Sequence, residues 1–164
     1  MLIRLAIEDD LSSIDNIYNQ AILTHKSTAD VVPYNRQERL AWYKNHNPDQ
    51  YPVFVTERDG VVIGYLSFSA YRPRRYALRF AAEISYFVHV DFHRQGIGSA
   101  LMEYGISVAP EYSIKYLIAI LLGHNEASIG LLNKYGFERW GLMPGIADFY
   151  GQERDHLYYG LKLL

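Results

Sequence analysis

Apolar and polar positions follow two periods along the chain, and these periods separate strands from helices. Segments with a period of two, or with a continuous apolar run, are predicted strands: residues 2–7, 52–57, 61–69, 82–90, 116–122, 137–141 and 156–163. Segments with a helical period are predicted helices: from a cap at Asp9 or Asp10 to Ile22, over Arg36–Lys44, from Gly98 to Pro110, and from an Asn125 cap to Gly136.

Three other segments are predicted to connect these elements. Asp59-Gly60 lies between two strands and is a strong hairpin signal. Residues 71–80 contain a proline and four arginines, and residues 141–151 are rich in Gly and Pro, so both are expected to be irregular. The resulting order, β-α-α-β-β-β-α-β-α-β-β, predicts an α/β fold in which an antiparallel first half leads into a β-α-β unit.

Composition narrows the function classes. The 164 residues are 49% hydrophobic and suit one domain over residues 1–164. A net charge of −2 argues against a general nucleic-acid or anionic-membrane binder. The chain has no cysteine, which excludes disulfides, thiolate nucleophiles and zinc-thiolate sites, and fits a reducing compartment. No His pattern suggests a metal site, no run approaches 18 apolar residues, and the first residues do not resemble a signal peptide.

The most informative segment is 88–100, where a strand meets a glycine loop that opens a helix. Gly96 and Gly98 would let backbone N–H groups point inward and form an anion site in front of the helix dipole. Plain turn geometry explains the same two glycines. A Rossmann fingerprint is excluded because Leu101 stands where a small residue is needed, and a P-loop is excluded because Gly98-Ser99 has no intervening Lys. A pyrophosphate held by amides fits what remains.

Several motifs together resemble the GNAT superfamily of N-acetyltransferases, and most closely the branch of phosphinothricin and methionine sulfoximine acetyltransferases. The matching pieces are Ala82-Glu83, Val88-His89-Val90, the loop from His93 to Gly98, Asn125 to Ile129, Lys134 to Phe137, and Gly151 with Asp155. The resemblance covers essentially the whole chain. It implies a GNAT-type acyl-CoA N-acyltransferase fold: a mixed, twisted sheet of six to seven strands flanked by helices. A V-shaped splay between strands 82–90 and 116–122 would admit the cofactor.

The resemblance also implies direct, acetyl-CoA-dependent acetylation of a small amino-acid-like amine by a cytoplasmic homodimer. The implied cofactor residues are Val88, His89, Val90, His93, Arg94, Gln95, Gly96, Ile97, Gly98, Ser99, Asn125 and Ser128. Val88 N–H is the candidate oxyanion donor. Without the family, Asn125 is explained as a helix cap. Glu83 matches the family's general base, and its alternative is a strand-end ion pair with a nearby arginine. Tyr135 is a candidate acid, and its alternative, the more common one for such a position, is a place in the core.

For the acceptor, the resemblance singles out Arg75 and Phe80. Arg79 and Tyr34 are added because arginine binds carboxylates bidentately and because Tyr34 suits an opposite wall. The alternative is a solvated arginine loop.

The chain departs from the family at three positions. These are His93, where Arg or Gln is usual, Leu132, where many members carry a tyrosine acid, and Glu153, where this branch usually has Trp.

Other functions remain open from the sequence. The acceptor amine could belong to a protein N-terminus, a polyamine or an aminoglycoside. The missing tyrosine acid also fits a non-catalytic acyl-CoA sensor. Nucleic-acid binding rests only on the arginine loop and its interleaved Tyr71 and Tyr76.

Overall fold

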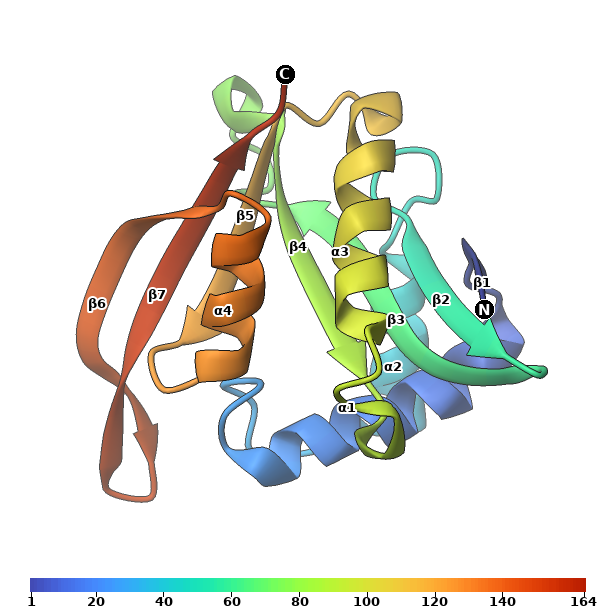
Figure 1. The fold of residues 1–164 in the computed structure, drawn as a ribbon, viewed down its shortest axis with the longest axis horizontal. Helices are drawn as coiled ribbons and strands as arrows, with labels where there is room; N and C mark the ends of the chain where they lie inside the picture. The colour runs from blue at the N-terminus through green and yellow to red at the C-terminus, as the bar shows by residue number, and fades with distance from the viewer.

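Seven strands form one mixed sheet in the order β1-β2-β3-β4-β5-β7-β6 in the computed structural model, which describes residues 1–164 (Figure 1). The strands are β1 (Leu2–Leu5), β2 (Val53–Arg58), β3 (Val61–Ala70), β4 (Ala81–Val88), β5 (Tyr116–Leu122), β6 (Glu138–Phe149) and β7 (Gln152–Lys162). The helices are α1 (Leu11–Thr24), α2 (Arg36–Lys44), α3 (Ile97–Val108) and α4 (Glu126–Lys134). The predicted order of elements and the parallel pairing across the β4-α3-β5 unit are confirmed.

The predicted hairpin turn at Asp59-Gly60 is also confirmed. Asp59 and Gly60 both have positive φ, 53° and 78°, as a tight two-residue hairpin turn requires. At the start of α1, Asp10 does not cap the helix as expected. The Asp10 carboxylate makes no capping bond to the helix; it accepts from Ile7 N–H and pairs with Arg4 at 2.8 Å. Asp10 therefore ties the helix start to β1.

The last two strands were predicted too short. Residues 141–151 are not an irregular excursion but the far half of a long hairpin between β6 and β7. Two register shifts, one of them around Pro144, absorb the residues that interrupt the apolar pattern. The hairpin tolerates a proline because β6 is the edge strand, where a missing N–H breaks no ladder.

The sheet separates two apolar layers. Helices α3 and α4 cover the near face in Figure 1, where residues such as Leu101, Met102 and Leu132 pack on β3, β4 and β5. Helix α1 packs Ile14 and Ile17 on the opposite face. No helix is both long and apolar enough to span a membrane.

Strands β4 and β5 pair over three residues only. Their register runs from Ala81 with Tyr116 to Glu83 with Ile118 and then stops. Beyond that point the strands diverge, as Figure 1 shows between β4 and the β5–α4 unit. The predicted V-shaped splay is therefore present, and it leaves one edge of β4 without a partner strand.

Candidate active site

The unpaired edge of β4 presents a row of backbone groups. Tyr71 N–H donates to the Ala81 carbonyl and His89 N–H donates to the Ile63 carbonyl, so the odd-numbered residues of this strand turn their backbone groups toward β3. Backbone groups alternate between the two edges of a strand. Those of Ile84, Tyr86 and Val88 therefore face the splay. An extended chain lying there can pair with β4 as an added strand.

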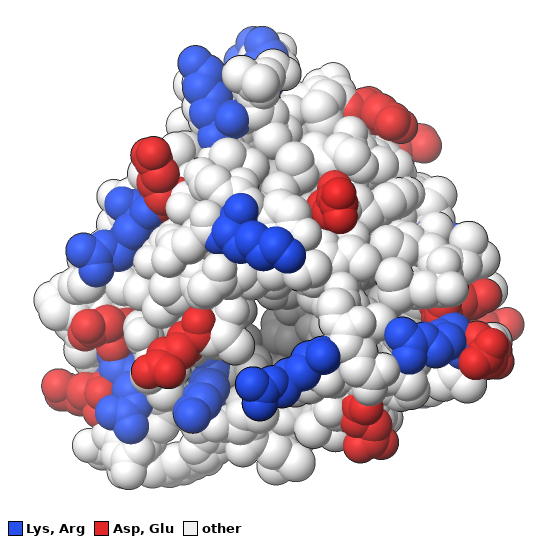
Figure 2. Space-filling view, viewed as in Figure 1, with Lys and Arg blue, Asp and Glu red and all other residues white.

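A cavity of about 600 Å³ opens at this splay. The end of β4, the loop after it and the start of α4 line it. The N-terminus of α3 also lines it, with Arg94 and Gly96 held at positive φ of 59° and 80°. The first N–H groups of a helix have no partner within the helix. Figure 2 shows a hollow on this face with basic side chains on either side of it. The cavity thus combines apolar walls with a helix N-terminus whose backbone N–H groups are suited to receive an anion.

Helix α1 closes one side of this cavity in part through Gln20, a residue that the sequence analysis did not select. The Gln20 side chain accepts from Val90 N–H at 3.0 Å and bonds the His89 ring at 2.9 Å. These contacts hold the loop after β4 against α1. Gln20 stands at a polar position of the helical pattern, between the apolar residues Tyr18 and Ala21, so the sequence carries no specific signal for it.

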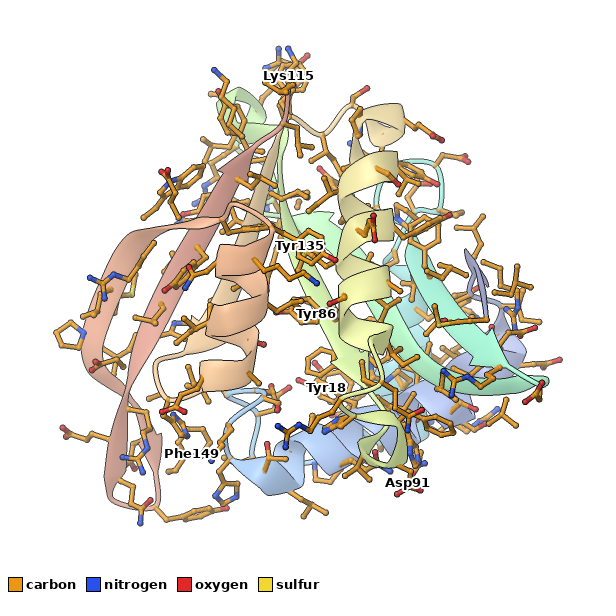
Figure 3. The ribbon with its side chains drawn as sticks, viewed as in Figure 1. Tyr18, Tyr86, Asp91, Lys115, Tyr135 and Phe149 are labelled. Carbon is orange, nitrogen blue, oxygen red and sulfur yellow. The ribbon has the colours of Figure 1, made fainter.

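Tyr86 is a second residue that the sequence analysis missed. Its hydroxyl donates to Ser128 Oγ at 3.0 Å, and both residues line the cavity. Burial raises the pKa of Tyr86 to about 12, so the phenol stays protonated at neutral pH. Figure 3 shows Tyr86 between α3 and α4. Asn125 lines the cavity as well and caps α4 by accepting from Ser128 N–H, which confirms the capping alternative.

Tyr135 lies outside the cavity that contains Tyr86 and Asn125. It is the residue that ends α4, lines neither of the two main cavities, and donates its hydroxyl to the Ser99 carbonyl at 3.1 Å. Its bond to the α3 backbone explains its position as packing between two helices. Its predicted role as acid therefore finds no support in the geometry, and Leu132 at the family's usual acid position is fully buried.

A second cavity, of about 510 Å³, adjoins the first, with Phe87 and Ser27 lining both. Glu83 projects into it from β4. Burial raises the pKa of Glu83, and a hydrogen bond with Ser85 opposes the shift. Glu83 forms no salt bridge, so the alternative of a strand-end ion pair with an arginine is wrong. A half-buried, unpaired carboxylate beside an apolar channel is placed to take up a proton.

Two histidines also line this second cavity. His46 donates through Nδ1 to the Trp42 carbonyl at 2.7 Å, which leaves Nε2 as an acceptor without a partner. Burial lowers the pKa of His46 and of His156, so both rings are uncharged at neutral pH. The sequence showed scattered histidines; only the fold brings these two together.

The expected acceptor residues separate in the structure. Tyr34 lines the second cavity. Arg75 and Arg79 are exposed and line neither cavity; they bond to backbone carbonyls of their own loop, and Arg79 stacks on Phe80 and Tyr76. The loop folds back on itself because its cations find aromatic faces and carbonyls nearby. A role for Arg75, Arg79 and Phe80 in holding the acceptor therefore finds no support in this geometry.

The sequence of this chain is similar to proteins of one known family. Residues 14–137 match the model of the acetyltransferase (GNAT) family. The chain belongs to the GNAT family of acetyltransferases. It is 32% identical to the L-methionine sulfoximine/L-methionine sulfone acetyltransferase of Salmonella typhimurium, over 99% of this chain and 95% of that protein. It is 31% identical to the L-amino acid N-acyltransferase MnaT of Escherichia coli, over 99% and 94%.

Solved GNAT structures agree with this assignment. The GNAT superfamily phosphinothricin acetyltransferase from Sinorhizobium meliloti, in complex with acetyl-CoA, superposes with a TM-score of 0.92 at 30% identity, covering 99% of this chain and 88% of that one. The match extends over the whole sheet, so the expected GNAT-type fold is confirmed.

Most residues expected to hold the cofactor of a GNAT enzyme line the first cavity. These are Val88, Val90, His93, Arg94, Gly96, Ile97, Gly98, Ser99, Asn125 and Ser128. His89 and Gln95 do not: the His89 ring bonds Gln20, and the Gln95 side chain bonds Arg58 and the Asp91 carbonyl. At the family's Arg or Gln position, His93 donates through Nε2 to the Val88 carbonyl at 2.9 Å. The imidazole therefore stabilises the loop rather than extending toward an anion.

Proposed function

We propose that this GNAT enzyme transfers the acetyl group of acetyl-CoA directly to the amine of a small amino-acid-like acceptor. One observation carries the proposal: a cofactor-sized channel along the free edge of β4 meets a second cavity that contains the unpaired Glu83. The names of the relatives support the acceptor class, since they denote enzymes of methionine sulfoximine, methionine sulfone and L-amino acids.

The residues present fit acetyl-CoA. The N–H groups at the start of α3 suit its pyrophosphate, and the backbone of Tyr86 to Val88 suits its amide-containing arm. When bound, the cofactor supplies the acetyl group as a thioester. Val88 N–H faces the splay and is our candidate donor to the oxygen that gains negative charge during transfer.

Glu83 acts as the general base that removes a proton from the acceptor amine. An amine reacts only when neutral, yet at neutral pH it arrives as an ammonium ion. The Glu83 carboxylate takes up that proton, directly or through one water, and burial brings its pKa closer to that of the amine. On the channel side, Ser128 and Tyr86 provide hydroxyl groups for the departing thiolate. The chain has no cysteine to form an acyl intermediate, so direct transfer is the simpler route.

The test is release of CoA from acetyl-CoA in the presence of L-methionine sulfone. Glu83→Gln should lower kcat by roughly 10²- to 10⁴-fold with little change in acetyl-CoA affinity. The parent rate should also fall as pH drops through the raised pKa of Glu83, because the protonated acid cannot act as a base. Glu83→Gln should lack this acid limb.

Glu103→Gln is the matched control, since Glu103 is an exposed acid on α3 far from either cavity lining. It should leave kcat unchanged. Turnover by Glu83→Gln at the parent rate would reduce Glu83 to a structural carboxylate. Binding of acetyl-CoA without turnover of any amine would favour the sensor alternative.

Two broader features complete the proposal. The absence of cysteine supports work in the reducing cytoplasm. The edge strand β6 exposes several apolar side chains, which supports a homodimer.

A further inference from the structure

Two side chains cover backbone groups at the end of the free edge of β4. The His93 ring bonds the Val88 carbonyl at 2.9 Å. The Gln20 side chain, from α1, accepts from Val90 N–H at 3.0 Å. Neither of these backbone groups can then pair with a chain that lies along the edge. Val88 N–H is therefore the last donor of the edge that stays open to the first cavity, and Gln20 and His93 determine where the open row ends.

The orientation of the Gln20 amide determines the state of the neighbouring His89 ring. Because Gln20 Oε1 accepts from Val90 N–H, the amide nitrogen faces His89 and lies 2.9 Å from the ring nitrogen Nε2. An amide nitrogen only donates, so His89 Nε2 must accept and carry no proton. An uncharged imidazole can do this, whereas a protonated imidazole donates from both nitrogens and accepts from neither.

The other groups around His89 compensate little for the loss of this bond. The side chain is 19% exposed and lies edge-on to Phe92, whose ring in turn holds the Arg58 guanidinium of β2 at 5.7 Å. On the side of Nδ1, Asp91 N–H lies at 3.3 Å, a longer contact than the one to Gln20. The Asp91 carboxylate lies 3.8 Å from Nδ1 but is 78% exposed, so water screens it. A protonated ring would therefore point an N–H at a donor on both sides.

We propose that Gln20 is a positioning residue for the cofactor, that it acts through uncharged His89, and that a proton on His89 weakens CoA binding. With a protonated ring, Gln20 cannot serve both partners. If it keeps Val90 N–H, its amide N–H groups face a ring N–H; if the amide turns to accept from the ring, Val90 N–H loses its acceptor. Either way the loop that follows Val88 loses a contact to α1. This inference rests on the proposed function, because it concerns the cofactor channel of that function.

The experiment is calorimetric titration with CoA at about pH 7.5 and about pH 5.5, which bracket the range in which imidazole usually titrates. Most rings of this kind are charged at the lower pH, so the Kd of the parent should rise about 10-fold as the competent fraction falls. In Gln20→Glu, the carboxylate can accept both from Val90 N–H and from a protonated ring. The ratio of its two Kd values should therefore be about 10-fold smaller than that of the parent. Protonation of CoA itself affects both proteins alike and cancels in this comparison.

Asn16→Asp is the matched control, since Asn16 is an exposed amide on the same helix. It should keep the pH response of the parent. If Gln20→Glu does not unfold cooperatively, Gln20→Met takes its place, because it removes both hydrogen bonds at similar volume. Gln20→Met should raise the Kd at the higher pH about 2- to 10-fold and show the smaller pH response.

Two outcomes contradict different parts of this account. A folded Gln20 variant with the same pH response as the parent overturns the positioning role and leaves the proposed function intact. A parent that does not bind CoA at neutral pH overturns the proposed function itself.

Discussion

At the scale of single residues, we propose that the hydroxyl pair of Tyr86 and Ser128 protonates the leaving thiolate in place of the tyrosine acid that many GNAT members carry. Tyr86 donates to Ser128, which leaves the Ser128 hydroxyl proton free to point into the cofactor channel. Ser128→Ala should lower kcat about 10- to 100-fold, because a hydrogen bond to a charged leaving group is lost. Tyr86→Phe should have a smaller effect on kcat, since it removes only the partner that orients Ser128. In initial-rate assays both should lower kcat more than they raise the KM of acetyl-CoA, because Tyr86 and Ser128 also line the cofactor channel.

Tyr104→Phe is a suitable control, because Tyr104 is a half-buried tyrosine of α3 that lines neither cavity. It should match the parent. A parent-like kcat for Ser128→Ala would show that solvent protonates the leaving thiolate and that the pair is only structural.

At the scale of elements, our proposed function assigns the pyrophosphate of the cofactor to the start of α3. Gly98 has no positive φ, and an added Cβ would lie 3.5 Å from Leu131 Cδ2, an ordinary contact. Gly98→Val should therefore fold. Both Gly98 and Leu131 line the channel, so the larger side chain crowds the amides that approach the pyrophosphate. Calorimetry should detect no binding of CoA to this variant, while its melting temperature changes by only a few degrees.

Gly130 provides the matched control on α4. It has open space around it and does not line the channel, so Gly130→Val should bind CoA like the parent. Parent-like affinity in Gly98→Val would instead place the pyrophosphate away from the glycine loop.

At the scale of the whole molecule, the exposed apolar side chains of β6 predict association. Leu142, Met143 and Ile146 are 42%, 42% and 59% exposed on an edge strand. An unpaired edge with apolar side chains is normally covered. Light scattering should give twice the 19.0 kDa chain mass for the parent, and Leu142→Lys with Ile146→Lys should return it to one chain. Val61→Lys, at an exposed apolar residue of β3, should remain dimeric. A monomeric parent would rule the dimer out.

Much of this protein follows from short stretches of sequence. The Asp59-Gly60 turn, the buried apolar run of β5 and the glycine loop before α3 depend on neighbours within a few residues, so their local pattern was sufficient. The length of the β6–β7 hairpin was not readable, because Pro144 and the glycines of β6 are tolerated only at a sheet edge, and the edge is defined by the order of all seven strands.

The set of residues that line the second cavity could be known only from the tertiary structure. Proximity in sequence suggested that Arg75 and Arg79 bind an acceptor next to Glu83. These side chains instead bond to carbonyl groups of their own loop. Arg39 reaches the cavity of Glu83 because α2 packs beside α1, where Asp15 and Tyr18 receive its guanidinium. Burial and charge pairing act through space between segments that are distant in the chain. The local sequence pattern was therefore sufficient for the family resemblance, the glycine loop and the candidate base Glu83, whereas only the packing of α1 and α2 on the sheet decided that Arg39 lines the same cavity as Glu83.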